Sequence, residues 1–126
     1  MSKQRTITLT GRPPVKINED AWPVIASAKD DSFSGNDYGR HQQASAQGEL
    51  DDYSIRVRQH DDGRAIVYAV FDAATAWTGN SSRSGGELLD KGADIAAAIA
   101  RVGEDVGIPD KVIRECVADL PAEELS

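Results

Sequence analysis

Cysteine is almost absent from this chain of 126 residues, which contains one, Cys116. A single thiol forms no intramolecular disulfide and no cysteine-based zinc site, so the sequence predicts a reducing compartment and no structural metal. A chain of this length buries a sufficient hydrophobic core without such cross-links. We therefore expect one domain, residues 1–126. Cys116 lies among apolar residues of a predicted helix, which indicates a buried structural thiol.

Long apolar runs are also missing. No stretch of about 18 consecutive apolar residues occurs, which is the length needed to span a membrane as a helix. The first ten residues, MSKQRTITLT, hold no apolar segment of the length found in a signal peptide. We expect a soluble, cytoplasmic protein with no membrane partner.

Side chains suited to catalysis are few. The two histidines, His41 and His60, have no motif partner. The serines near residue 82 lack the Gly-x-Ser-x-Gly pattern of a nucleophile elbow, and Gly85-Gly86 lacks the lysine of a phosphate-binding loop. Carboxylates are abundant, but none follows the spacing of a calcium-binding loop. The sequence therefore predicts no metal and no cofactor, and it favours a non-catalytic protein without excluding an enzyme.

Negative charge is concentrated in the second half of the chain, whose net charge overall is −7. Residues 1–60 carry eight basic and eight acidic side chains, whereas residues 61–126 carry six basic and thirteen acidic ones. Nucleic acid is bound by clustered Lys and Arg, so this half is a poor partner for it. A basic protein surface is the better expected partner.

Residues 53–72 predict a β-hairpin at the centre of the hydrophobic core. Two runs rich in Ile, Val and Tyr flank Asp61-Asp62-Gly63, and an acidic-Gly turn between alternating segments favours a hairpin. A two-residue loop, which we favour, pairs Arg58 with Val67 and puts Arg58 on the face opposite Tyr68. A three-residue loop with Gly63 in a left-handed bulge pairs Arg58 with Ile66 instead.

The remaining segments predict an α+β fold. Residues 5–17 indicate a loose hairpin, and residues 29–50 and 79–86 read as a polar loop and a flexible connector. Helical spacing and caps favour three helices, and we expect an antiparallel sheet of three to four strands, built on the central hairpin and covered by two or three of them. The expected helices span residues 19–28, 87–104 and 109–120.

Four stretches of the chain carry a resemblance to a known group of proteins. They are TLTGRPPVKI at 8–17, IRVRQHDDGRAIVY at 55–68, TAWTG at 75–79 and LLDKGADIAAAIARVGED at 88–105. With these stretches the chain resembles small accessory proteins carried on plasmids, integrative elements and phages of proteobacteria. Small acidic proteins from such elements include anti-CRISPR proteins of type I systems. The resemblance implies an inhibitor of a host defence complex, and it assigns no catalytic residues.

Two functional hypotheses follow, beside a third, that the protein is a self-associating structural module. The first is a small acidic mobile-element protein that acts as a stoichiometric inhibitor, binding a basic protein surface, such as that of a nucleic-acid-binding defence complex. Its contact residues would lie on the acidic C-terminal helices: Glu104, Asp105, Glu115 and Asp119. The alternative is a small enzyme or anion-binding domain that uses one face of the hairpin, with Arg56, Arg58 and His60 around a carboxylate or phosphate. The oligomeric state and the role of residues 29–50 stay open.

Overall fold

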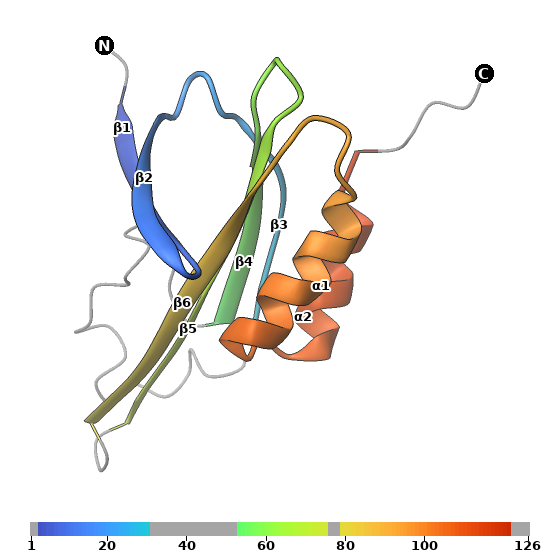
Figure 1. The fold of residues 1–126 in the computed structure, drawn as a ribbon. Helices are drawn as coiled ribbons and strands as arrows, with labels where there is room; N and C mark the ends of the chain where they lie inside the picture. The colour runs from blue at the N-terminus through green and yellow to red at the C-terminus, as the bar shows by residue number, and fades with distance from the viewer. Residues whose placement is uncertain (1–2, 31–52, 76–78, 122–126) are drawn as a thin grey trace.

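The computed structural model describes residues 3–30, 53–75 and 79–121 and arranges them in three layers (Figure 1). A two-stranded sheet, a four-stranded sheet and a pair of helices follow one another. Both sheets are antiparallel, and the larger one has the order β3-β4-β5-β6. The elements are β1 (Gln4–Leu9), β2 (Arg12–Asn18), β3 (Val24–Asp30), β4 (Tyr53–Gln59), β5 (Ala65–Thr75), β6 (Gly79–Leu89), α1 (Ile95–Val106) and α2 (Asp110–Asp119). The predicted α+β fold is confirmed.

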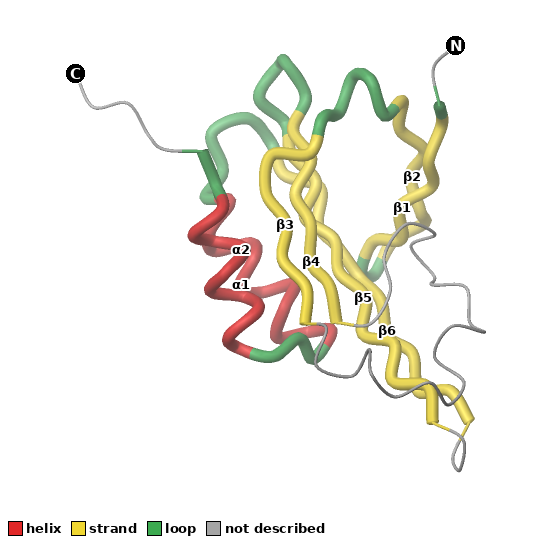
Figure 2. The backbone as a smooth tube through the Cα atoms, turned by 180° about the vertical axis from the view of Figure 1, so that it is seen from behind, coloured by secondary structure: helices red, strands yellow, loops and turns green. Residues whose placement is uncertain are grey.

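The four-stranded sheet is covered on both faces, and its strand β5 shows this directly. Every residue from Ala65 to Val70 is buried. A strand buried on both faces needs a continuous apolar run rather than strict alternation, and AIVYAV is such a run. Seen from behind, the helices lie on one side of this sheet and the β1–β2 hairpin lies on the other (Figure 2).

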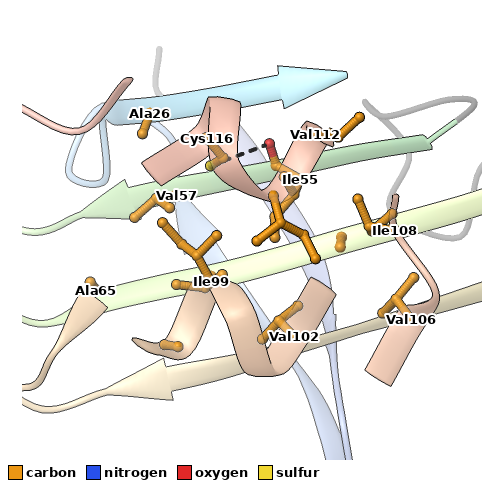
Figure 3. Packing of buried hydrophobic residues seen from close by; sticks show 14 of the residues in the cluster. Ala26, Ile55, Val57, Ala65, Ile99, Val102, Val106, Ile108, Val112 and Cys116 are labelled. Carbon is orange, nitrogen blue, oxygen red and sulfur yellow. Dashed lines mark hydrogen bonds between the residues drawn. The ribbon is translucent and has the colours of Figure 1, made fainter. Parts of the chain in front are cut away.

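The helix-side core fills the space between the sheet and the two helices (Figure 3). Apolar residues at helical spacing, such as Ile99 and Val102 of α1, pack onto strand residues such as Val57 and Val67. Asp94 begins α1 as its N-cap, and its side chain accepts a hydrogen bond from the Ala97 N–H. The buried members are Ala26, Ile55, Val57, Ala65, Val67, Ala69, Leu89, Ala98, Ile99, Val102, Val106, Ile108, Val112, Ile113 and Cys116.

The hairpin-side core lies between the other face of the sheet and the β1–β2 hairpin. The hairpin predicted over residues 5–17 is confirmed, with Ile7 paired to Val15. Its apolar residues face the sheet, where Tyr68 is the largest fully buried side chain. The buried members of this second cluster are Ile7, Leu9, Ile17, Trp22, Ile66, Tyr68 and Val70.

The helix predicted at residues 19–28 is wrong, because this stretch forms a turn followed by β3. Pro23 has no N–H and keeps the preceding Trp22 out of the helical region. Val24 and Ile25 are β-branched, which favours a strand. The Pro23 carbonyl accepts a hydrogen bond from the Gln59 N–H, so pairing with β4 begins at the proline. The apolar spacing taken for one helical face is divided between the two cores, with Trp22 in one and Ala26 in the other.

The connector predicted at residues 79–86 is also wrong, because these residues begin β6. The glycines mark a close approach of two layers rather than flexibility. A Cβ on Gly86 would lie 2.7 Å from the Val67 carbonyl oxygen, and one on Gly85 would lie 2.4 Å from Thr10 Oγ1.

The helix predicted over residues 87–104 begins later than expected, at Ile95, because β6 continues to Leu89. The predicted last helix is confirmed as α2, and residues 31–50 of the predicted loop lie outside the described residues.

The favoured hairpin register is wrong by one residue. Arg58 pairs with Ile66 and Arg56 with Tyr68, which is the register of the three-residue loop. Gly63 has a φ of 98°, its N–H donates to the His60 carbonyl at 2.9 Å, and the His60 N–H donates to the Arg64 carbonyl. Glycine adopts this left-handed conformation without strain, as the bulge position of a three-residue loop requires. As a consequence Arg58 and Tyr68 share one face of the sheet.

Candidate functional site

Arg58 lies in the interior, with 5% of its surface exposed. Its Nε donates a hydrogen bond to Tyr68 Oη at 2.8 Å, and its Nη1 donates to the Trp22 carbonyl oxygen at 2.9 Å. Its Nη2 lies 3.7 Å from Glu19 Oε1, and this carboxylate also accepts from Arg5 Nε. A buried arginine needs such a set of partners to offset its desolvation. Arg58 therefore joins the turn that follows β2, residues 19–22, to the sheet, and its side chain lies in the interior.

His60 lies at the hairpin tip, where it packs against an aromatic ring. Its ring centroid is 5.1 Å from that of Trp22, and the Arg64 guanidinium lies 5.2 Å from the same indole. The Asp62 N–H donates to His60 Nδ1 at 3.1 Å. A hydrogen bond from the Arg64 backbone N–H lowers the pKa of Asp62 below its ordinary value. These contacts shape the turn.

The alternative site is therefore not assembled as predicted. Arg56 is half-buried and shares the face of Arg58 by strand alternation, while His60 is half-buried beside Trp22. The sheet face that carries the two arginines faces the β1–β2 hairpin and its apolar core. The one-residue error in register caused this, because it assigned Arg58 to the side opposite Tyr68.

The four acidic residues predicted as a binding surface are all exposed, but they do not form one cluster. Asp105 Oδ2 accepts a hydrogen bond from Thr10 Oγ1 at 3.3 Å, beside β6. Asp119 Oδ2 accepts from the Ser27 N–H of β3 at 3.0 Å. Because β3 and β6 are the outer strands of the larger sheet, these two carboxylates lie at opposite sides of the helix layer. Glu104 and Glu115 lie on its outer surface.

The helix layer as a whole carries an excess of negative charge. Residues 94–119 contain six acidic side chains and three basic ones, a net charge of −3. Two of the three cations contact acids of the protein itself. Arg101 Nη2 lies 3.0 Å from Glu87 Oε1, and Arg114 Nε lies 3.3 Å from Asp110 Oδ2. This pairing reduces the positive charge that the surface presents to a partner.

A cleft of about 570 Å³ opens where α1 begins and α2 ends, which the sequence did not predict. Its lining comes from four parts of the chain, and it is mostly apolar. Ile25 and Leu120 both line the cleft, although they lie far apart in the sequence. Because residues 19–28 were predicted as a helix, the position of Ile25 in β3 was not expected. The lining residues are Ile25, Gln59, Gly92, Ala93, Asp94, Ile95, Ala96, Leu120 and Pro121.

A smaller cleft of about 350 Å³, most of whose lining residues are polar or charged, lies at the β6 side of the helix layer. Glu87, Arg101 and Asp105 line it together with Thr10 and Val102. Its charged groups contact one another or Thr10, as described above. Among the described residues no three His, Cys, Asp or Glu side chains gather in a way that would hold a metal ion.

Cys116 is fully buried in the helix-side core, as predicted. Its Sγ lies 4.0 Å from the Ile55 carbonyl oxygen (Figure 3). Burial and, to a smaller extent, the charge of Asp119 raise the pKa of the thiol to about 12. A thiol that stays protonated near neutral pH is a weak nucleophile, so this residue has a packing role.

Comparison with known proteins gives no family for this chain. No protein-family model, no curated protein and no solved structure matches it. None of the helices in the described part of the chain has the length and apolar character that crossing a membrane requires.

Proposed function

We propose that this protein is a stoichiometric inhibitor that uses its acidic helix layer to bind a basic protein surface. The observation that carries the proposal is the net charge of −3 over residues 94–119, with Arg101 and Arg114 already paired to acids of the chain. The partner class is a nucleic-acid-binding protein, as for an anti-CRISPR protein that blocks a host defence complex. Carboxylates presented on a rigid surface compete with phosphates for the same Lys and Arg side chains.

The two helices hold the fold through their inner faces, so their outer faces are available for binding. The buried residues of α2, for example, are Val112, Ile113 and Cys116, and all three belong to the helix-side core. Glu104 and Glu115 are exposed on the outer surface. Asp105 and Asp119 also contact Thr10 and β3, so their replacement would disturb the fold as well as the charge. The experiment that tests the function therefore replaces Glu104 and Glu115.

The experiment begins with recovery of a partner from a bacterial host lysate and continues with the purified complex. The double variant Glu104→Lys/Glu115→Lys is expected to slow association at least about tenfold, because charge steers the encounter and is screened within about 8–10 Å. Association rates are measured at several salt concentrations by surface plasmon resonance. Thermal unfolding is expected to change little, since both side chains are exposed.

The matched control is Asp20→Lys/Asp61→Lys, which makes the same charge change at exposed positions outside the helix layer. Its association rate is expected to stay much closer to that of the natural protein. The proposal is wrong if no basic protein forms a stoichiometric complex. It is also wrong if the two double variants associate equally fast and with equal salt dependence.

A further inference from the structure

We infer that the cleft between the start of α1 and the end of α2 binds an apolar side chain that the partner carries on a basic segment. The inference rests on the proposed function and names what the partner presents at one end of the helix layer. Three observations lead to it: the apolar lining of the cleft, its continuity with the helix-side core, and the charge around it.

The apolar lining is an extension of the helix-side core. Ile25, Ile95 and Leu120 are half-buried and pack against that core on one side. On the other side they line the cleft. An apolar side chain placed there would contact the same cluster that holds the helices on the sheet. Interfaces concentrate their binding energy where an apolar anchor enters such a preformed pocket.

The charge around the cleft favours a partner segment that has basic residues next to that apolar side chain. Asp94 lines the cleft, and Asp119 directly precedes the lining residue Leu120. Asp90 and Lys91, which carry opposite charges, directly precede the lining residue Gly92 in the sequence. Among the described residues that line the cleft, Asp94 is the one charged side chain, and it belongs to a helix layer of net charge −3, which favours Lys or Arg beside the anchor.

The same charge argues against a second copy of this chain as the occupant. Docking one helix layer on another would bring two surfaces of net charge −3 together. Like charges that face each other across an interface suppress association. A partner segment with an apolar residue between cations matches both the lining and the rim of the cleft.

The test uses two synthetic peptides as probes, titrated into the natural protein and followed by NMR chemical shifts. One carries a leucine between two pairs of lysines, and the other has glycine in place of the leucine. The leucine peptide is expected to bind about tenfold more tightly, since burying a leucine side chain even partly is worth that factor. The shifts are expected at Ile25, Ile95 and Leu120.

A blocking variant separates the cleft from general charge attraction. Ala93→Trp places a large side chain at an exposed lining position and changes no charge, while its backbone N–H keeps its bond to the Asp90 carbonyl. It is expected to abolish the tenfold preference for leucine. Ala118→Trp, at an exposed position of α2 outside the cleft, is the matched control and is expected to keep the preference.

The outcomes distinguish this inference from the proposed function. If both peptides bind equally to the natural protein, or if Ala93→Trp keeps the preference, the cleft is not the anchor site. The same conclusion follows if neither peptide binds. The proposed function still stands in those cases if a basic partner is recovered and Glu104→Lys/Glu115→Lys slows its association.

Discussion

The two faces of the central sheet are held by different physical means. On the helix side the buried cluster contains apolar residues and one thiol. On the hairpin side the apolar cluster shares its space with Arg58, which bonds to Tyr68 and to the Trp22 carbonyl oxygen. The comparison shows that a helix layer is fixed here by shape and apolar area, whereas the hairpin layer is fixed in addition by oriented polar contacts.

The cause lies in what each layer needs from the sheet. Helices satisfy their own backbone hydrogen bonds and present side chains to the sheet. A two-stranded hairpin is marginal on its own and depends on the surface below it. The Thr10 N–H donates to the Gly86 carbonyl, and the Gly86 N–H donates to Thr10 Oγ1, so the hairpin turn is also bonded to β6. Arg58 supplies the contact at the other end, next to Trp22.

The largest expected effect comes from removing apolar volume on the helix side. Ile99 is fully buried there, and Ile99→Ala is expected to cost about 3–5 kcal/mol of unfolding free energy through lost burial and a residual cavity. The matched change on the hairpin side, Ile7→Ala, is expected to cost about 2 kcal/mol, because a thin layer can shift to close part of the cavity. Urea unfolding with an unchanged slope gives both values. Equal losses would contradict the difference between the layers.

The next effect tests the polar contacts of the hairpin side. Arg58→Ala is expected to cost about 2–3 kcal/mol, because it leaves Tyr68 Oη and the Trp22 carbonyl oxygen buried without this donor. Arg58→Lys is expected to recover less than half of that loss, since an ammonium lacks the forked geometry of a guanidinium. Chemical denaturation of the three proteins measures these differences.

Arg5→Ala provides the control for that prediction. Arg5 contacts the same carboxylate, Glu19, but its side chain is 27% exposed. Water reaches this half-buried ion pair, so we expect Arg5→Ala to cost about 1 kcal/mol, near the upper end of the range for exposed pairs. If the losses at Arg5 and Arg58 were equal, the position of Arg58 inside the hairpin-side core would not matter, and the comparison of the two faces would lose its basis.

The features that follow from local chemistry could be predicted from sequence. The turn at Asp61-Asp62-Gly63 and the last helix have residues whose local preferences agree with the fold. The α+β class followed from them. The exact register did not, because two- and three-residue loops both use Gly63 and differ only in contacts made across the layers. Residues 19–28 were wrongly predicted as a helix because their apolar side chains pack into two different cores, Trp22 into one and Ala26 into the other. This division depends on tertiary structure.

The charge of the candidate site and the exposure of two of its residues could be predicted from the sequence. The exposure of Glu104 and Glu115 follows from helical periodicity. The contact of Asp119 with the Ser27 N–H does not, because it joins residues of different elements. The cleft could not be predicted either, since Ile25 and Leu120 meet only after β3 and α2 pack together.

The smallest expected effect is a pH dependence of the unfolding free energy that comes from Cys116 in the helix-side core. Its pKa is raised to about 12 in the folded protein, mainly because burial disfavours the thiolate, while an unfolded chain releases the proton near pH 8.5–9. Above that pH the unfolded state binds fewer protons than the folded state, so the free energy of unfolding falls as pH rises toward 12. The stabilising contribution is complete below about pH 8 and decreases by about 1 kcal/mol by pH 9.5.

Comparison with Cys116→Ala isolates this contribution, because other groups titrate equally in both proteins. The unfolding free energy of the natural protein minus that of the variant is expected to be constant from pH 6 to 8 and to fall by about 1 kcal/mol at pH 9.5. Denaturant unfolding at each pH supplies the values. A difference that stays flat to pH 9.5 would mean that the thiol ionises alike in both states, and that the helix-side core does not exclude charge as its apolar composition predicts.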